Sequence, residues 1–181
     1  HCVSYAPFQG AQTPADPSLW VAPEQMDADL KLLAQRFDCV RTYSIAHGQD
    51  AIPRLAKDHG LSVILGVWIS RDPVRNAAEI KRAVDLAREF PDTIRAIVVG
   101  NETLLRREIP ADRLGALIRE VKAATGLPVT YADVWEFWLQ NAGLAKDVDF
   151  VTIHILPYWE DIPIDINRAV PHVRKIGRAH V

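Results

Sequence analysis

Asn101 and Glu102 stand at the end of a nearly unbroken apolar run, residues 94–99, and follow it through a single glycine. A carboxyl group that a buried strand delivers to a pocket mouth is partly desolvated, which favours its protonated form. Such a group can give a proton to a departing oxygen and later take one from water or another acceptor. The pair therefore indicates general acid–base chemistry at Glu102, with Asn101 as a neighbouring hydrogen-bonding group.

Polar or aromatic side chains also end the other apolar runs of the chain. One such ending alone has a plain structural explanation, because Asn101 could cap the next segment and Glu102 could lie in its first turn. Six coincident endings favour a shared cleft instead. In chain order, the candidate cleft residues are Tyr5, Arg41, Tyr43, Trp68, Asn101, Glu102, Tyr131, Asp133, His154 and Tyr158.

The elements that position these residues alternate between two patterns. Apolar runs rich in β-branched residues predict strands over 2–5, 39–43, 62–68, 94–100, 129–131 and 150–154. The segments between them carry the spacing of amphipathic helices, at Leu30, Leu33, Ala34 and Phe37 in the first and at Leu114, Leu117, Ile118 and Val121 in the fourth. This alternation predicts a parallel sheet covered by helices.

Residues at the element boundaries agree with this division. Asp50 is predicted to cap a helix that has Pro53 in its first turn, and Asp72 to cap the next one. Gly126 is predicted to end the fourth helix. No Pro-, Gly- or Ser-rich linker divides the chain, so we expect a single domain.

Two architectures fit such a sheet, a doubly wound open sheet and a (β/α)8 barrel. No Gly-x-Gly-x-x-Gly or Walker-type loop follows the first strand, although an open sheet that binds nucleotides usually has one. In a barrel, the carboxyl ends of the strands surround the active site. We therefore expect an α/β fold, a (β/α)8 TIM barrel truncated to about its first six βα units.

Composition excludes several classes of partner. The 181 residues are 49% hydrophobic and 24% charged, which suits one globular domain with a sizeable core. A formal net charge of −2 gives no excess of base for a phosphate backbone, so nucleic acid is not an expected partner. No apolar run approaches the roughly 18 residues of a membrane span, so we expect no membrane insertion.

Two cysteines are too few for a disulfide framework. Cys2 and Cys39 could face each other on neighbouring strands, but two buried free thiols are the preferred interpretation. The charged stretches 71–75 and 106–108 are interpreted as solvated surface.

Aromatic residues follow the last two predicted strands. Flat side chains suit sugar rings, whose C–H faces stack on them while the hydroxyl groups bond to polar neighbours. A short helix packed on the barrel would explain the first cluster equally well, and we prefer that explanation for Phe137. The clusters are Trp135, Phe137 and Trp138 after the fifth strand, and Tyr158, Trp159 and Glu160 after the sixth.

Four segments carry a family resemblance that extends over residues 2–174: Val3-Ser4-Tyr5, Val40-Arg41-Thr42-Tyr43-Ser44, Ile97-Val98-Val99-Gly100-Asn101-Glu102 and His154-Ile155-Leu156-Pro157-Tyr158-Trp159-Glu160. Together they resemble glycoside hydrolase family 17, above all its bacterial branch of β-1,3-glucanases and glucan transglycosylases. The resemblance implies a retaining glycosidase or transglycosylase acting on β-glucan with β-1,3 or β-1,6 linkages. Glu102 would be its general acid/base, and Asn101 would bond a sugar hydroxyl. No cofactor or metal is expected, and the location would be the periplasm, the cell envelope or the exterior.

The family's nucleophile is a glutamate at the end of strand seven, in a Glu-x-Gly-Trp-Pro type motif that these 181 residues lack. Asp133 and Glu160 fit substrate contacts better than that role, so we expect the chain alone to be inactive. The resemblance also makes the remaining rim residues candidates for substrate binding. They are Tyr5, Arg41, Tyr43, Trp68, Tyr131, Trp135, His154, Tyr158 and Trp159.

Two other functions compete with this one. A non-catalytic barrel could keep the aromatic rim for binding carbohydrate without chemistry. A metal-dependent barrel hydrolase could use His154 with His47, Asp133 or Glu102 as ligands. That class usually has clustered histidines, whereas the histidines of this chain are scattered.

The last residues, Ile-Gly-Arg-Ala-His-Val, match the translation of a sequencing-adapter run, ATC GGA AGA GCA CAC GTC. We therefore expect residues 1–174 to be a partial catalytic domain and residues 175–181 to be a tail that is not native.

Overall fold

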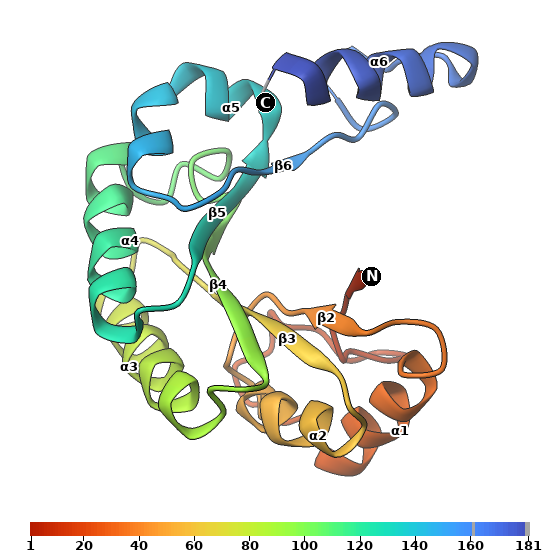
Figure 1. Ribbon diagram of the computed structural model, residues 1–181, viewed down its shortest axis with the longest axis vertical. Helices are drawn as coiled ribbons and strands as arrows, with labels where there is room; N and C mark the ends of the chain where they lie inside the picture. The colour runs from red at the N-terminus through yellow and green to blue at the C-terminus, as the bar shows by residue number, and fades with distance from the viewer. Residues whose placement is uncertain (161, 180–181) are drawn as a thin grey trace.

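Six parallel strands form one sheet whose spatial order follows the chain order. In the computed structural model, which describes residues 1–160 and 162–179, the sheet curls into a half-barrel (Figure 1). The predicted α/β fold, a (β/α)8 barrel truncated to about its first six βα units, is confirmed. The strands are β1 (Cys2–Ser4), β2 (Cys39–Arg41), β3 (Ser62–Val67), β4 (Ile94–Asn101), β5 (Val129–Val134) and β6 (Thr152–His154).

Helices occupy the crossovers between consecutive strands, as parallel pairing requires. The first four α-helices lie along the convex side of the sheet, and its concave side faces the opening of the arc (Figure 1). The helical elements are α1 (Pro23–Leu33), η1 (Gln49–Ala51), α2 (Ile52–Asp58), α3 (Pro73–Glu89), α4 (Ala111–Thr125), α5 (Trp135–Gln140), η2 (Ala142–Lys146) and α6 (Ile166–Ala179).

The main core lies between the sheet and these helices. Strand side chains such as Val63, Ile97 and Val99 have no exposed surface. The predicted face of α4 meets them, because Leu114, Leu117, Ile118 and Val121 are all buried. Each fully buried aliphatic side chain of this size contributes about 1.5 to 3 kcal/mol. The rigid sheet therefore fixes where its strand ends lie.

Two of the three predicted helix boundaries are confirmed. Asp72 caps α3 by accepting hydrogen bonds from the Val74 and Arg75 amides, and Gly126 ends α4 in the left-handed conformation, at φ +66°. The prediction for Asp50 is wrong. Asp50 lies in η1, and its carboxylate accepts hydrogen bonds from the Arg82 guanidinium at 3.0 and 3.1 Å. An ion pair to α3 has taken the place of a helix cap.

The first helix is shorter than its spacing predicts. It ends at Leu33, and residues 34–36 form a turn that leads toward β2. Phe37 therefore lies beyond the helix, and the buried side chains of α1 are Met26 and Leu30.

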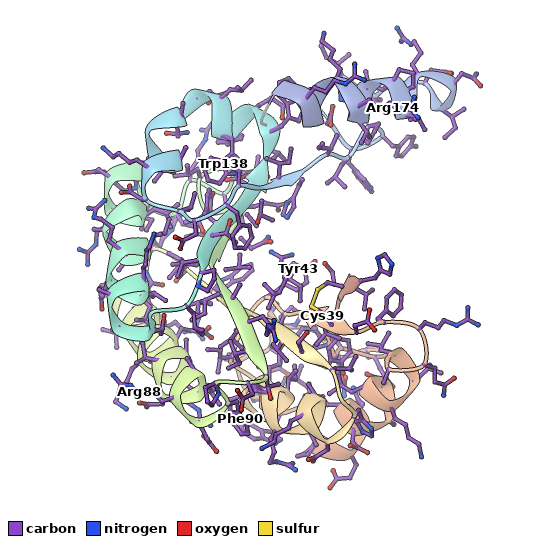
Figure 2. All side chains as sticks on the ribbon, viewed as in Figure 1. Cys39, Tyr43, Arg88, Phe90, Trp138 and Arg174 are labelled. Carbon is purple, nitrogen blue, oxygen red and sulfur yellow. A yellow bond between two sulfur atoms is a disulfide. The ribbon has the colours of Figure 1, made fainter. Side chains whose placement is uncertain are left out.

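The preference for free thiols is wrong, because Cys2 and Cys39 form a disulfide (Figure 2). The two residues are direct partners in the parallel pairing of β1 with β2, with their Cα atoms 4.3 Å apart. This short separation, at the lower edge of what native disulfides show, brings the two sulfurs into bonding reach.

Helix α6 extends away from the end of the sheet (Figure 1). It contains the buried Ile176 and exposes Ile166 and Val170. Among the described residues, no helix combines the length and apolar character needed to cross a membrane. The expectation of a tail that is not native covers residues 175–181, of which 180 and 181 lie outside the described residues.

Candidate active site

The turn after β4 fixes the backbone of Glu102. Gly100 has φ +87°, and a Cβ atom there would lie 2.6 Å from the Thr103 hydroxyl. Glu102 itself has φ +52°, a left-handed conformation that costs on the order of 1 kcal/mol or more in a residue other than glycine. Its amide donates to the carbonyl of Ala132 on β5 at 2.7 Å. Because surrounding contacts maintain this strained turn, Glu102 has a defined place at the carboxyl end of the sheet.

Glu102 and His154 meet at this end of the sheet. Glu102 Oε1 lies 2.7 Å from His154 Nδ1, and the two side chains are 27% and 19% exposed. The contact joins the ends of β4 and β6. A carboxyl group that is partly exposed and has one titratable partner can exchange a proton with a bound ligand.

Asn101 is oriented by Arg41 from β2. Arg41 Nη2 donates to Asn101 Oδ1 at 2.6 Å, and the guanidinium lies 4.0 Å from the centre of the Tyr43 ring. Figure 2 places Tyr43 on the concave side of the sheet. Burial lowers the pKa of Arg41, yet a guanidinium remains charged in proteins. With the amide oxygen held by Arg41, Asn101 presents its NH2 group as a donor.

Tyr131 and Asp133 form a buried pair behind this rim. The Tyr131 hydroxyl donates to Asp133 Oδ2 and accepts the Leu104 amide at 2.9 Å. Burial raises the pKa of Asp133, and the nearby Glu102 carboxylate adds to this increase. Burial and the Asp133 carboxylate likewise raise the pKa of Tyr131. The pair supports the turn that follows Glu102, although both residues were predicted to bind substrate directly.

Trp68 lies beside the same turn, against an arginine that the sequence analysis missed. The Arg106 guanidinium lies 4.1 Å from the Trp68 ring centre and donates to the carbonyl oxygens of Ile69 and Asn101, each at 3.0 Å. Arg106 also pairs with Glu108, and their side chains are only 25% and 17% exposed. The interpretation of this charged stretch as solvated surface is therefore wrong for Arg106 and Glu108.

Tyr5 directly follows β1, one residue past the end of the strand that was predicted over 2–5, and its side chain is buried. Its hydroxyl donates to Asp29 of α1 at 2.9 Å. Burial and the Asp29 carboxylate raise the pKa of this phenol. Tyr5 thus connects the sheet end to α1.

Of the predicted residues after β5 and β6, Trp135 and Glu160 contact α6, whereas the buried Trp138 packs on Tyr131 with the ring centres 5.6 Å apart, and Tyr158 lies edge-on to Trp159. Glu160 Oε2 lies 2.7 Å from His172 Nε2, and the Trp135 ring lies edge-on to the same histidine. Tyr158 and Trp159 are 77% and 82% exposed. No direct contact with Glu102 is recorded for these residues in the part of the chain that the structure describes.

A pocket of about 590 Å³ opens beside the ends of the first three strands. Its wall combines the predicted Tyr43 and Trp68 with Phe8, His47 and Glu79. None of the last three was predicted to bind substrate, because they lie on loops or on a helix and no strand-end pattern marks them, and His47 was named only as a ligand in the metal-dependent alternative.

Within the described residues there is no group of three or more His, Cys, Asp or Glu side chains that could hold a metal ion. His47 lines the pocket, where its Nδ1 lies 3.0 Å from the Leu19 carbonyl oxygen, while His154 contacts Glu102. In the metal-dependent alternative, these two histidines would bind the same ion. Each of them instead contacts a different residue of the protein.

Known proteins resemble this chain in sequence and in fold. The profile of the BtgE/BtgC glycoside hydrolase domain matches residues 2–177. A glucan 1,3-beta-glucosidase of Schizosaccharomyces pombe is 32% identical over 145 residues, which cover 74% of this chain and 45% of the relative. The chain thus spans less than half the length of this curated relative.

Solved structures share the fold. The family 17 beta-1,3-glucanosyltransferase of Rhizomucor miehei superposes with a TM-score of 0.79 at 23% identity, over 99% of this chain and 66% of that one. An active-site mutant of that enzyme, in complex with laminaritriose, superposes equally well over the same shares, with a TM-score of 0.79 at 23% identity. At this level of identity the likeness establishes the fold.

Proposed function

Because this chain belongs to the BtgE/BtgC glycoside hydrolase domain family, within glycoside hydrolase family 17, we propose that it supplies the acid/base part of a retaining β-glucan active site. The protein would be a glycosidase or transglycosylase, and Glu102 would carry the proton. One observation carries the proposal: Glu102 stands in a strained turn at the carboxyl end of β4, beside Asn101 and in contact with His154.

In the first step, protonated Glu102 gives its proton to the glycosidic oxygen as the bond from that oxygen to the anomeric carbon breaks. The NH2 group of Asn101 is free of Arg41 and would donate to a sugar hydroxyl beside that bond. After a glycosyl-enzyme has formed, the Glu102 carboxylate takes a proton from water or from an acceptor sugar. The oxygen that has lost this proton attacks the anomeric carbon and breaks its bond to the enzyme, which releases the sugar with its original anomeric configuration.

The retaining mechanism needs a second carboxylate about 5 to 5.5 Å from the first. Asp133 holds Tyr131 and two backbone amides, and Glu160 holds His172. These protein contacts support assigning neither as the nucleophile. The resemblance to family 17 implies a glutamate on a later strand for this role.

We propose β-glucan as the substrate, with β-1,3-linked chains as the first to test. The name of the yeast relative and the trisaccharide bound to the Rhizomucor miehei mutant support this choice. Arg41 and Arg106 cover one face of the Tyr43 and Trp68 rings, and the opposite faces would fit the C–H faces of glucose.

We also propose that the protein works in an oxidising compartment, the periplasm, the cell envelope or the exterior. The disulfide between Cys2 and Cys39 supports this location, since disulfides persist mainly outside the reducing cytosol.

The test uses the complete protein that contains these residues. Products from a laminarin-type glucan are followed by NMR, which reports the anomer first released and separates hydrolysis from transfer. Retained configuration is expected, with turnover reduced about a hundredfold or more by Glu102→Gln. Glu120→Gln, an exposed position on α4, is the matched control and should leave turnover unchanged. Binding without turnover in the wild-type protein would favour a non-catalytic carbohydrate-binding barrel.

A further inference from the structure

Glu79 of α3 connects the ends of two strands, although it does not lie on either of them. Its carboxylate accepts hydrogen bonds from the Ser44 hydroxyl at 2.8 Å and from the Ala46 amide at 3.1 Å. The Ile45 amide donates to both of its oxygens, at 3.2 and 3.3 Å. From the other side, the Trp68 amide donates to Oε2 at 3.0 Å. One half-buried side chain thus holds the turn after β2 and the first residue after β3.

The chemistry of this contact depends on a carboxylate. Three backbone amides and one hydroxyl all donate, so the acceptor needs two oxygens with several lone pairs. A glutamine would place an NH2 group against at least one of these donors and leave it unsatisfied. Burial raises the pKa of Glu79, while the four donors oppose that increase.

The segments held by Glu79 carry the aromatic wall of the pocket. Tyr43 directly precedes the Ser44–Ala46 turn, and the ring of Trp68 belongs to the residue whose amide Glu79 accepts. Phe8 and His47 contribute further ring surface to the same 590 Å³ space. Rings around a pocket with hydroxyl and amide groups are suited to a sugar.

Trp68, whose amide Glu79 accepts, also lies near the candidate proton donor Glu102. Trp68 lies under the Arg106 guanidinium, and Arg106 donates to the carbonyl oxygen of Asn101, the residue before Glu102. Glu79 is therefore linked to the turn after β4 through two side chains, Trp68 and Arg106. Trp68 and Arg106 thus place the pocket beside the turn that carries the acid/base residue.

We propose that Glu79 is a positioning residue that shapes the pocket beside Tyr43 and Trp68 to hold a glucose unit away from the scissile bond. This inference rests on the proposed function, because it assigns the pocket to the same glucan chain that Glu102 cleaves. Glu79 would therefore determine how strongly kcat/KM depends on the length of the glucan substrate.

The test compares Glu79→Gln with wild type in the complete protein, using β-1,3-linked glucose oligomers of two and six units. A productive disaccharide only spans the scissile bond, whereas a hexasaccharide also reaches the pocket. The variant should lower kcat/KM for the hexasaccharide about tenfold and leave that for the disaccharide within about twofold. A loss of equal size for both lengths, or no loss for either, would overturn the proposal.

Two further variants guard against misfolding. Ser44→Ala removes one donor and leaves the carboxylate in place, so it should give a smaller loss that again falls only on the long substrate. Glu24→Gln, at an exposed position of α1, is the control for loss of a glutamate charge. Equal thermal midpoints for the control and wild type would show that removing one glutamate charge does not unfold the protein.

Binding measured separately distinguishes this proposal from the proposed function. In the Glu102→Gln background, Glu79→Gln should raise the Kd of the hexasaccharide about tenfold. If Glu102→Gln retained full turnover while this increase in Kd appeared, the acid/base assignment would fail and the positioning role would hold. An unchanged Kd would reject the positioning role whatever the turnover.

Discussion

Glu102 and His154 are 52 positions apart in the chain, and their side chains meet at 2.7 Å. The meeting follows from topology: parallel strands β4, β5 and β6 are neighbours, so their carboxyl ends lie side by side. Tyr131 and Asp133, from the strand between, support the turn from behind. The candidate proton donor is thus held by contacts from three strands.

His154→Ala should impair catalysis more than binding. The variant leaves Glu102 without its side-chain partner, and a lost hydrogen bond to a charged group corresponds to a decrease of about ten- to a hundredfold in kcat/KM on glucan. Steady-state kinetics of the complete protein would measure the change. His154→Gln can still donate to Glu102 and should recover part of the activity. Rates within about twofold of wild type for the alanine variant would contradict this role.

Asp133→Asn should change how stability depends on pH. Burial raises the folded-state pKa of Asp133 above its ordinary value of 3.8. The stability that this group contributes is therefore complete below pH 3.8 and is lost as pH rises through the raised value. Asparagine does not ionise, so this loss is absent from the variant. The free energy of unfolding of the variant minus that of the wild type should therefore increase as pH rises from about 4 to 8.

Denaturant unfolding of both proteins at a series of pH values would measure this difference. The Tyr131 hydrogen bond lowers the pKa of Asp133 but does not cancel the effect of burial, so the slope of the stability difference against pH is the diagnostic quantity. A constant difference, or one that falls as pH rises, would contradict the assigned direction of the pKa shift.

Removal of the disulfide should destabilise the protein. The bond closes a loop between positions separated by 37 residues, for which chain entropy predicts a loss of about 3 to 4 kcal/mol in the free energy of unfolding. Cys2→Ser with Cys39→Ser, compared with wild type in and out of reductant, would measure the loss. Reductant should destabilise the wild type alone. Equal stability of all forms would exclude a structural role for the bond.

Gly100→Ala should destabilise the turn before Glu102. The added Cβ would lie 2.6 Å from the Thr103 hydroxyl, and alanine disfavours a φ of +87°. Together these effects should lower the free energy of unfolding by about 1 to 3 kcal/mol. Turnover should fall as well, because the turn positions Glu102. Gly143→Ala is the matched control, since a Cβ there meets nothing within 4 Å. Similar unfolding free energies for the two variants would argue against strain at Gly100.

The strand ends were predictable because period and burial specify a parallel sheet, and a parallel sheet gathers its carboxyl ends. Asn101 and Glu102 could therefore be found without coordinates. The bond between Cys2 and Cys39 could not, because it depends on the register of β1 against β2, which composition does not encode. A one-residue slip would have turned the two cysteines to different faces.

Other residues escaped prediction because their partners lie far away in the chain. Arg106 lies in a charged stretch typical of solvated surface, yet it packs on Trp68, which lies far earlier in the chain. Glu79 lies on a helix whose spacing gives no sign that its carboxylate holds two distant turns. For Tyr158 and Trp159, the loop after β6 determines their position, and a strand pattern carries no information on loop direction.

The leaving-group dependence of Glu102→Gln tests the central claim most directly. Proton donation matters when the departing oxygen is a poor leaving group, as in glucan, and little when it belongs to an acidic phenol. In the complete protein, the variant should lose about a hundredfold or more in the rate of bond cleavage on β-1,3-glucan. It should form the glycosyl-enzyme from a dinitrophenyl glucoside at nearly the wild-type rate. An equal loss on both substrates, or none on glucan, would contradict the assignment of Glu102 as the proton donor.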